Sequence, residues 1–155
     1  MPSLLNELLD PNQVVLNLRA TTEGEAILEI ASVLRANGKV ERYYEFCDAV
    51  MEREGRSSTN TGDSVAFPHA RTDLVETMVL GIGRSTKGVR FGESKVPVQL
   101  IFLLGVPERM VNDYLVCVGT LARLVGDKAF RATLLKAETP EEFIEQLRTA
   151  SLVLE

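Results

Sequence analysis

Hydrophobic residues at steps of three and four predict two amphipathic helices in the first third of the chain. The first covers residues 23–36, between a Thr-Thr pair that can cap a helix and an Asn-Gly pair that can end one. The second begins near Tyr44. Because Gly55 interrupts its pattern, we expect it to end near Arg53 or Glu54.

The same periodicity predicts three more helices in the last third of the chain. One begins at Asn112 and carries its pattern to Val125, a shorter one runs from about Asp127 to Lys136, and Pro140 opens the last. Acidic residues follow Pro140, where the helix macrodipole favours negative charge. The C-terminal region is therefore expected to be entirely helical.

Three short, β-branched or aliphatic runs predict strands, at residues 14–18, 78–82 and 97–104. The third run is so uniformly apolar that both of its faces must be covered, so we expect it at the centre of the sheet. A polar loop, Arg56–Gly62, leads into Val65–His69, to which the pattern assigns no element. Helices at both ends of the chain with strands between them predict a layered α/β domain.

Composition limits the classes of function. The 155 residues contain no Pro/Gly/Ser-rich or charge-block linker, so we expect a single domain, residues 1–155. A net charge of −5, with Lys and Arg scattered along the chain, provides no basic surface for nucleic acid. The longest apolar run, Leu100–Leu104, is far shorter than the roughly 20 residues of a membrane helix, so no membrane insertion is expected.

The N-terminus and the cysteines indicate a reducing compartment. Met1–Glu7 lacks a basic segment followed by an apolar stretch, so we expect no secretion and a cytoplasmic location. Cys47 and Cys117 lie within predicted helices, without CxxC spacing and without a histidine at ligand spacing. We therefore expect reduced cysteines in the core, and we predict no metal site and no cofactor.

His69 is the single histidine of the chain, and a lone histidine is more often structural than reactive. Its surroundings favour chemistry, because Pro68 holds the backbone beside the imidazole, Arg71 follows, and a hydroxyl-rich, glycine-bearing loop precedes it. We predict an anion pocket around a neutral, nucleophilic imidazole, with Arg53 and Arg71 as the cations that disfavour the protonated ring. Each arginine alone is more often a solvated surface charge.

Other catalytic patterns are weaker. Gly81–Gly88 follows a predicted strand, but Thr86 replaces the third glycine of a dinucleotide fingerprint and Val89 replaces the P-loop lysine. We therefore predict an ordinary strand-to-loop turn there. The sequence lacks the G-x-S-x-G motif of serine hydrolases. A hydrolase would need His69 to pair in space with a serine or cysteine that is distant in sequence, and this alternative is left open.

The residues around His69 resemble, in type and spacing, the active-site signature of enzyme IIA of the fructose, mannitol and nitrogen-regulatory class. That class belongs to the phosphoenolpyruvate:sugar phosphotransferase system. The matching residues are Arg53-Glu54, Ser58-Thr59, Gly62, Ala66 and Pro68-His69. The stretches that also look like this family are Gly83–Phe91, Pro97–Leu104 and the pattern Leu115, Val118, Leu121-Ala122, so the resemblance covers residues 4 to 150, nearly the whole chain.

The resemblance implies a mixed β-sheet of about five strands between helices, the mannitol- and nitrogen-type fold. It implies that His69 accepts phosphate from the phosphocarrier protein HPr and passes it to a IIB domain or a regulatory protein. Arg53 matches the family arginine that stabilises the phosphorylated histidine, and Thr59 matches a hydroxyl position beside the pocket, which we expect to bind phosphate. Because no second domain is fused to this chain, we favour a regulatory, nitrogen-type role, with a fructose-type IIA as the alternative.

Tyr114 departs from the family pattern. In many members the helix that matches Asn112–Val125 begins with His-Leu, and this second histidine faces the first; here the pair is Tyr114-Leu115. Tyrosine can donate a hydrogen bond to a phosphate oxygen, but it stays neutral near pH 7. We therefore predict that Tyr114 binds phosphate, with transfer that is slower or tuned for signalling.

A second hypothesis is a protein-binding module that keeps this fold and no longer transfers phosphate. Tyr114 is its main argument, whereas the presence of both Arg53 and His69 favours the carrier. Val65 and Phe67 are candidates for a surface that faces HPr, with burial in the sheet the alternative for at least one of them.

Overall fold

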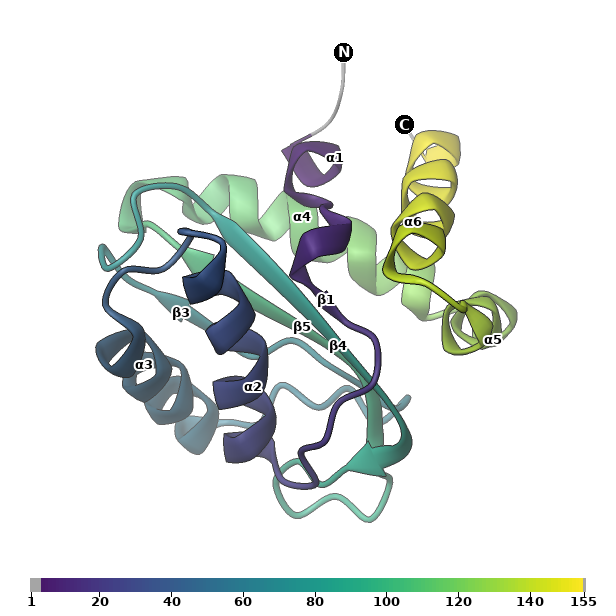
Figure 1. The fold of residues 1–155 in the computed structure, drawn as a ribbon, viewed down its shortest axis with the longest axis horizontal. Helices are drawn as coiled ribbons and strands as arrows, with labels where there is room; N and C mark the ends of the chain where they lie inside the picture. The colour runs from purple at the N-terminus through teal and green to yellow at the C-terminus, as the bar shows by residue number, and fades with distance from the viewer. Residues whose placement is uncertain (1–3, 155) are drawn as a thin grey trace.

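The computed structural model describes residues 4–154 and shows a sheet between two layers of helices (Figure 1). The strands are β1 (Val14–Val15), β2 (Val65–Ala66), β3 (His69–Arg71), β4 (Val79–Val89) and β5 (Val98–Val106). The helices are α1 (Leu4–Leu8), α2 (Glu23–Ala36), α3 (Tyr43–Arg56), α4 (Val111–Val125), α5 (Lys128–Lys136) and α6 (Pro140–Leu154). Short 3-10 turns, η1 (Pro11–Gln13) and η2 (Glu108–Met110), precede β1 and α4. Met1, Pro2, Ser3 and Glu155 of the expected 1–155 domain lie outside the described residues.

The sheet has five strands in the order β1-β4-β5-β2, and β3 also pairs with β5. β4 runs antiparallel to β5, whereas β1 is parallel to β4, and both β2 and β3 are parallel to β5. This confirms the expected layered α/β fold with a mixed sheet of five strands. The segment 65–71, which the hydrophobic pattern left without an element, supplies the two short strands beside β5.

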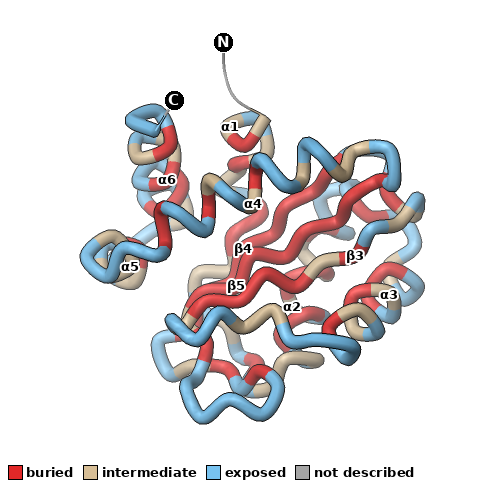
Figure 2. The backbone as a smooth tube through the Cα atoms, turned by 180° about the vertical axis from the view of Figure 1, so that it is seen from behind, coloured by how far each residue is buried: buried red, intermediate tan, exposed pale blue. Residues whose placement is uncertain are grey.

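β5 is the interior strand that separates two hydrophobic cores, as its uniformly apolar sequence predicts. Leu100, Phe102 and Leu104 pack with residues of α1, α4, α5 and α6. Ile101 and Leu103 alternate with them and pack with residues of α2 and α3 on the other face. Figure 2 shows β4 and β5 buried along most of their length, whereas most exposed residues lie on the helices and in the loops.

β4 is longer than expected, because the turn predicted for Gly81–Gly88 is a continuation of the strand to Val89. Helix α2 crosses directly over the strand: a Cβ atom on Gly81 or Gly83 would lie 2.6 or 2.7 Å from side-chain atoms of Ile30. The two glycines allow α2 to pack closely on the sheet. Because they have no side chains, the alternation of apolar and polar residues that is typical of a strand is absent from this part of the sequence. A register shift between Arg84 and Val89 adds a β-bulge.

Two other boundaries also differ from the expectation. Helix α3 continues past Gly55 to Arg56, because a single exposed glycine costs only about 1 kcal/mol in a helix, less than its packed face contributes. Strand β1 ends at Val15 instead of residue 18, because the backbone bends at Leu16 and Asn17 after Val14 and Val15 have paired with β4. Both cysteines are free and buried as predicted, Cys47 on the α2/α3 side of the sheet and Cys117 on the α4 side.

None of the helices between residues 4 and 154 is long and apolar enough to cross a bilayer. The longest of them, α4 and α6, have 15 residues each. This finding agrees with the short apolar runs of the sequence.

Arg84 joins the sheet to the C-terminal helices. Its side chain is only 6% exposed, and its guanidinium donates to the carbonyls of Leu134 at 3.0 Å and Ala137 at 2.7 Å, at the end of α5. It also donates to Leu16 O at 3.0 Å. The cation thus adds a charged donor to carbonyl groups at the C-terminal end of α5, where the helix macrodipole favours positive charge.

We predict that Arg84→Met lowers the free energy of unfolding by about 1–3 kcal/mol, because it removes the guanidinium donor from the carbonyl groups of Leu16, Leu134 and Ala137. Urea unfolding measures the change. Lys87→Met, an exposed cation of the same strand, is the control and should stay within about 0.5 kcal/mol of the wild type. Equal effects of the two substitutions would contradict the bridging role of Arg84.

Candidate functional site

His69 is the first residue of β3 and is presented from an edge segment of the sheet toward α4. It pairs in register with Leu104, which packs in the core on the α4 side, so the two side chains lie on the same face. Leu104 N donates to Pro68 O at 3.0 Å and holds the backbone before the histidine. The ring is partly exposed, so a reacting group can approach it.

The ring nitrogens of His69 have different environments. Nδ1 lies 3.0 Å from the carbonyl oxygen of Phe67. Because a carbonyl oxygen can only accept, Nδ1 carries the proton and donates in this contact, and Nε2 keeps its lone pair in the neutral ring. Nε2 is therefore the nucleophilic nitrogen.

The charge state of His69 suits a nucleophile. Burial lowers the pKa of the imidazole, and the positive charge of Arg53 lowers it further; the hydrogen bond to Phe67 and the negative charge of Glu54 act in the opposite direction. The net effect places the pKa of His69 below its ordinary value of 6.5, so the ring is mainly neutral at pH 7.

Arg53 and Tyr114 approach His69 from opposite helix layers. Arg53 lies in the last turn of α3, where its guanidinium donates to Ser57 O at 2.9 Å. Its charge acts on both other groups: it lowers the pKa of His69 and opposes the increase that burial causes in the pKa of Tyr114. The structure therefore brings together three of the residues singled out from the sequence.

Tyr114 lies in the first turns of α4 with its ring tilted by 36° to the imidazole and the ring centroids 5.0 Å apart. Its hydroxyl oxygen is 3.4 Å from Nδ1 and 3.5 Å from Nε2. These are long contacts for hydrogen bonds, so the hydroxyl remains available to a group bound at Nε2. Burial raises its pKa, so Tyr114 stays a neutral donor at pH 7.

Thr59 and Glu54 form a tight pair beside the histidine. Thr59 donates to the Glu54 carboxylate twice, from its backbone N–H at 2.7 Å and from its hydroxyl at 2.6 Å. The Thr59 hydroxyl oxygen accepts from Phe67 N at 3.2 Å. Its only proton is thus engaged by Glu54, and binding of phosphate by Thr59 stays a prediction.

Sequence reasoning assigned no role to Glu54, although the residue belongs to the block that resembles the family signature. Only 6% of its surface is exposed, which is uncommon for a carboxylate. A glutamate in the last turn of a helix, where the macrodipole disfavours negative charge, was the available signal.

Arg71 and the predicted apolar residues, Val65 and Phe67, lie outside the group formed by His69, Arg53 and Tyr114. Arg71 is exposed on β3, two residues after His69 and on the same strand face, and its binding of phosphate stays a prediction. Val65 and Phe67 are 1% and 7% exposed, so the alternative of burial in the sheet is confirmed for both, and neither contributes to a partner-facing surface. Both pack inside the sheet layers. The exposed apolar residues next to Tyr114 are Leu115 and Val116, at 56% and 69%.

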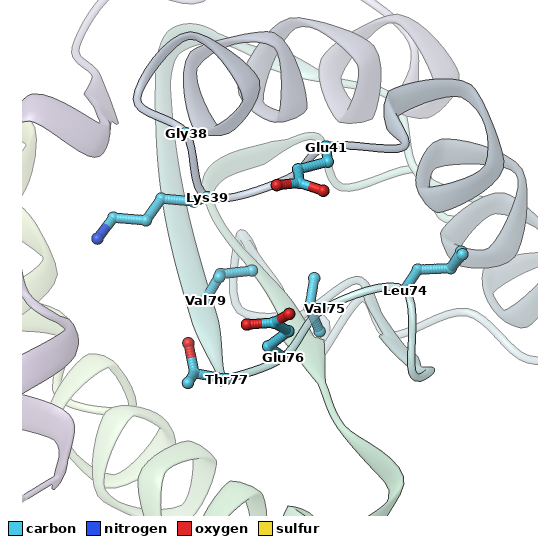
Figure 3. A pocket seen from close by; sticks show the side chains of 8 residues that line it. All are labelled: Gly38, Lys39, Glu41, Leu74, Val75, Glu76, Thr77 and Val79. Carbon is cyan, nitrogen blue, oxygen red and sulfur yellow. The ribbon is translucent and has the colours of Figure 1, made fainter.

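A cavity of about 240 Å³ lies away from these residues, between the α2–α3 loop and the segment that precedes β4. Figure 3 shows the carboxylates of Glu41 and Glu76 directed toward this space, while the Lys39 side chain points away from it. Two carboxylates repel an anion, and none of the predicted site residues lines the cavity. It takes no part in the site around His69.

Comparison with known proteins gives a family match over almost the whole chain. Residues 7–150 match the family model described as phosphoenolpyruvate-dependent sugar phosphotransferase system, EIIA 2. A fructose-specific EIIA component of Haloferax volcanii is 33% identical over 125 residues, which cover 79% of each chain. A fructose-specific EIIABC component of Bacillus subtilis is 30% identical over 142 residues, 91% of this chain and 22% of that protein. The chain thus spans about a fifth of the length of that multidomain relative.

Solved structures show the same fold. The nitrogen regulatory protein IIA-Ntr of Neisseria meningitidis superposes with a TM-score of 0.80 and 27% identity, covering 94% of this chain and 99% of that one. Enzyme IIAMtl of Escherichia coli, in its complex with phosphorylated enzyme IIBMtl, gives a TM-score of 0.79 and 25% identity, covering 91% and 97%. The nitrogen-regulatory and the mannitol-type structure thus superpose on this chain almost equally well.

We predict that Arg53→Gln raises the pKa of His69, because a positive charge that disfavours the imidazolium ion is removed while the ring stays buried. The single histidine makes the measurement unambiguous in an NMR titration. In the wild type the pKa of His69 should lie below 6.5. The free energy of unfolding should therefore decrease as the pH falls from 6.5 to the folded-state pKa, because the unfolded chain binds the proton first.

The matched control is Arg56→Gln, an exposed arginine of the same helical turn that pairs with Glu52. It should leave the His69 titration unchanged. An unchanged or lower pKa in Arg53→Gln would show that the guanidinium does not act on the imidazole.

Proposed function

The chain belongs to the EIIA 2 family of the phosphoenolpyruvate-dependent sugar phosphotransferase system, and we propose that it carries a phosphoryl group on Nε2 of His69. The observation that supports this most directly is the 3.0 Å hydrogen bond from Nδ1 to Phe67 O, which leaves Nε2 with a free lone pair. The neutral state favoured at pH 7 makes that lone pair available.

The proposed transfer requires little covalent chemistry from the protein. The Nε2 lone pair attacks the phosphorus atom of a donor phosphohistidine, the new N–P bond forms, and the donor nitrogen leaves with the electron pair of the old one. The transition state is loose, with charge on three equatorial oxygens, so positioning and stabilisation of charge are the main tasks. Passing the group onward is the same step in reverse, with His69 as the leaving group.

Three groups are proposed to stabilise the phosphoryl oxygens. Arg53 supplies positive charge close to the ring, as its effect on the His69 pKa indicates. Tyr114 supplies a hydroxyl proton from the side of α4, at 3.5 Å from Nε2. Arg71 is proposed as a further, exposed cation on the same face of β3.

We propose HPr as the phosphoryl donor and a IIB domain or a regulatory protein as the acceptor. The similar enzyme IIAMtl is known in complex with a phosphorylated enzyme IIBMtl. Leu115 and Val116, exposed beside Tyr114, supply apolar area for such a partner next to the reacting nitrogen. Residues 1–155 are proposed to act as one EIIA domain, and the expected location stays the cytoplasm.

A direct test uses phosphoenolpyruvate, enzyme I and HPr as the phosphoryl source. We predict that the wild-type protein gains the mass of one phosphate in an acid-labile form, and that His69→Ala gains none. Intact mass spectrometry before and after acid treatment measures both. A wild type that stays unlabelled, under conditions that label a known enzyme IIA, would favour the protein-binding module instead.

The role of Tyr114 is tested separately. Tyr114→Phe keeps the ring that packs on the α4 side and removes only the hydroxyl, so we predict phosphorylation slower by roughly 2- to 10-fold. Tyr43→Phe, which removes a hydroxyl bonded to Leu28 O on the other face of the sheet, is the control and should react like the wild type. Equal rates for both variants would exclude a contribution of the Tyr114 hydroxyl.

A further inference from the structure

We propose that Glu54 and Thr59 are positioning residues that anchor the backbone of Phe67 and thereby determine which nitrogen of His69 stays unprotonated. The consequence for transfer rests on the proposed function. The effect on the ring itself does not, because it exists in the protein without phosphate.

A continuous series of hydrogen bonds connects α3 to the imidazole. The Glu54 carboxylate accepts from the Thr59 hydroxyl at 2.6 Å, the Thr59 hydroxyl oxygen accepts from Phe67 N at 3.2 Å, and Phe67 O accepts from Nδ1 of His69 at 3.0 Å. A second bond, from Thr59 N to Glu54 at 2.7 Å, fixes the threonine backbone. Every group between the carboxylate and the ring therefore has a defined partner.

The negative charge of Glu54 sets the direction of this series. A threonine hydroxyl has one proton, and an ionised carboxylate can only accept, so the proton points to Glu54. The lone pairs of the hydroxyl oxygen are then directed to the Phe67 N–H. A neutral or missing partner at position 54 would leave the hydroxyl free to rotate.

The backbone around Phe67 turns this anchor into a fixed carbonyl direction. Phe67 precedes Pro68, and a residue before proline is restricted in its φ and ψ angles. With its N–H held by Thr59 and Pro68 O held by Leu104 N at 3.0 Å, the Phe67 carbonyl has little freedom to turn away from Nδ1. The carbonyl then requires a proton on Nδ1.

Glu54 is otherwise unfavourable at this place. Its charge raises the pKa of His69 and of Glu23, and it lies close to where a phosphoryl group would add further negative charge. It forms no salt bridge within residues 4–154, where the ion pairs are Arg42–Glu45 and Arg56–Glu52. A buried carboxylate that opposes the charge of the carried group is explained by its hydrogen bonds to Thr59.

The test compares Thr59→Val, which keeps the shape of the side chain and removes the hydroxyl, with Thr59→Ser, which keeps the hydroxyl. The ¹⁵N shifts of the single imidazole report the ratio of the two neutral tautomers. Thr61→Val is the matched control, because the Thr61 hydroxyl lies in the same loop and bonds Val65 O at 3.1 Å, outside the series. Urea unfolding verifies that each variant is folded.

We expect Thr59→Val to shift the tautomer ratio toward the form protonated at Nε2 by roughly 2- to 10-fold, the loss of about one hydrogen bond. Thr59→Ser and Thr61→Val should retain the wild-type ratio. A folded Thr59→Val with an unchanged ratio, or an equal shift in Thr61→Val, would overturn the proposal. If Thr59→Val does not fold, Glu54→Gln decides by the same measurement. Its neutral amide no longer fixes the direction of the Thr59 hydroxyl, so a shift toward the form protonated at Nε2 is expected, and an unchanged ratio would overturn the proposal.

Phosphorylation by HPr then separates the two proposals. If both hold, the rate in Thr59→Val falls in proportion to the fraction of rings that carry the proton on Nδ1, and Thr59→Ser restores it. If the tautomer shifts but the wild type accepts no phosphate, the positioning role stands and the carrier function fails. If the wild type accepts phosphate and Thr59→Val leaves the tautomer ratio unchanged, the carrier function stands and the positioning role fails.

Discussion

The hydrogen bond between Nδ1 of His69 and the carbonyl of Phe67 is the constraint on which the site depends. Nδ1 donates to the carbonyl oxygen at 3.0 Å, so Nε2 is left as the acceptor. Two further hydrogen bonds, from Phe67 N to Thr59 and from Leu104 N to Pro68 O, hold the backbone on both sides of this carbonyl in place. Burial and Arg53 together keep the ring neutral. A histidine with one free lone pair and a nearby cation is the minimum equipment of a phosphoryl carrier.

The layered fold explains how groups from distant parts of the chain meet at this ring. The short strand β3 carries His69 beside the interior strand β5, and helices on both faces of the sheet reach it there. From one face, the last turn of α3 supplies Arg53 and Glu54; from the other, the first turns of α4 supply Tyr114. Because each helix is fixed by its own hydrophobic core, the positions of these side chains follow from packing that lies away from the site.

Hydrophobic periodicity predicted the elements in which each side chain packs on one face of its own helix or strand. The helices and the buried strand β5 are of this kind, and so is the burial of both cysteines. Prediction failed where one residue serves a neighbour that is remote in sequence: Gly83 accommodates Ile30 of α2, and Arg84 binds the carbonyls that end α5. In the site, residue types around His69 indicated the nucleophile and Arg53. The pairing of Glu54 with Thr59 and the orientation of the Phe67 carbonyl depend on three-dimensional geometry and had no sequence pattern of their own.

The central claim concerns one atom, and it is tested most directly on the phosphorylated protein itself. In ¹⁵N-labelled protein, the coupling between phosphorus and the imidazole nitrogens identifies the nitrogen that bears the phosphoryl group. The geometry of His69 predicts phosphorus bonded to Nε2, with the proton retained on Nδ1. Phosphorus on Nδ1, or on a side chain other than His69, would contradict this account of the site.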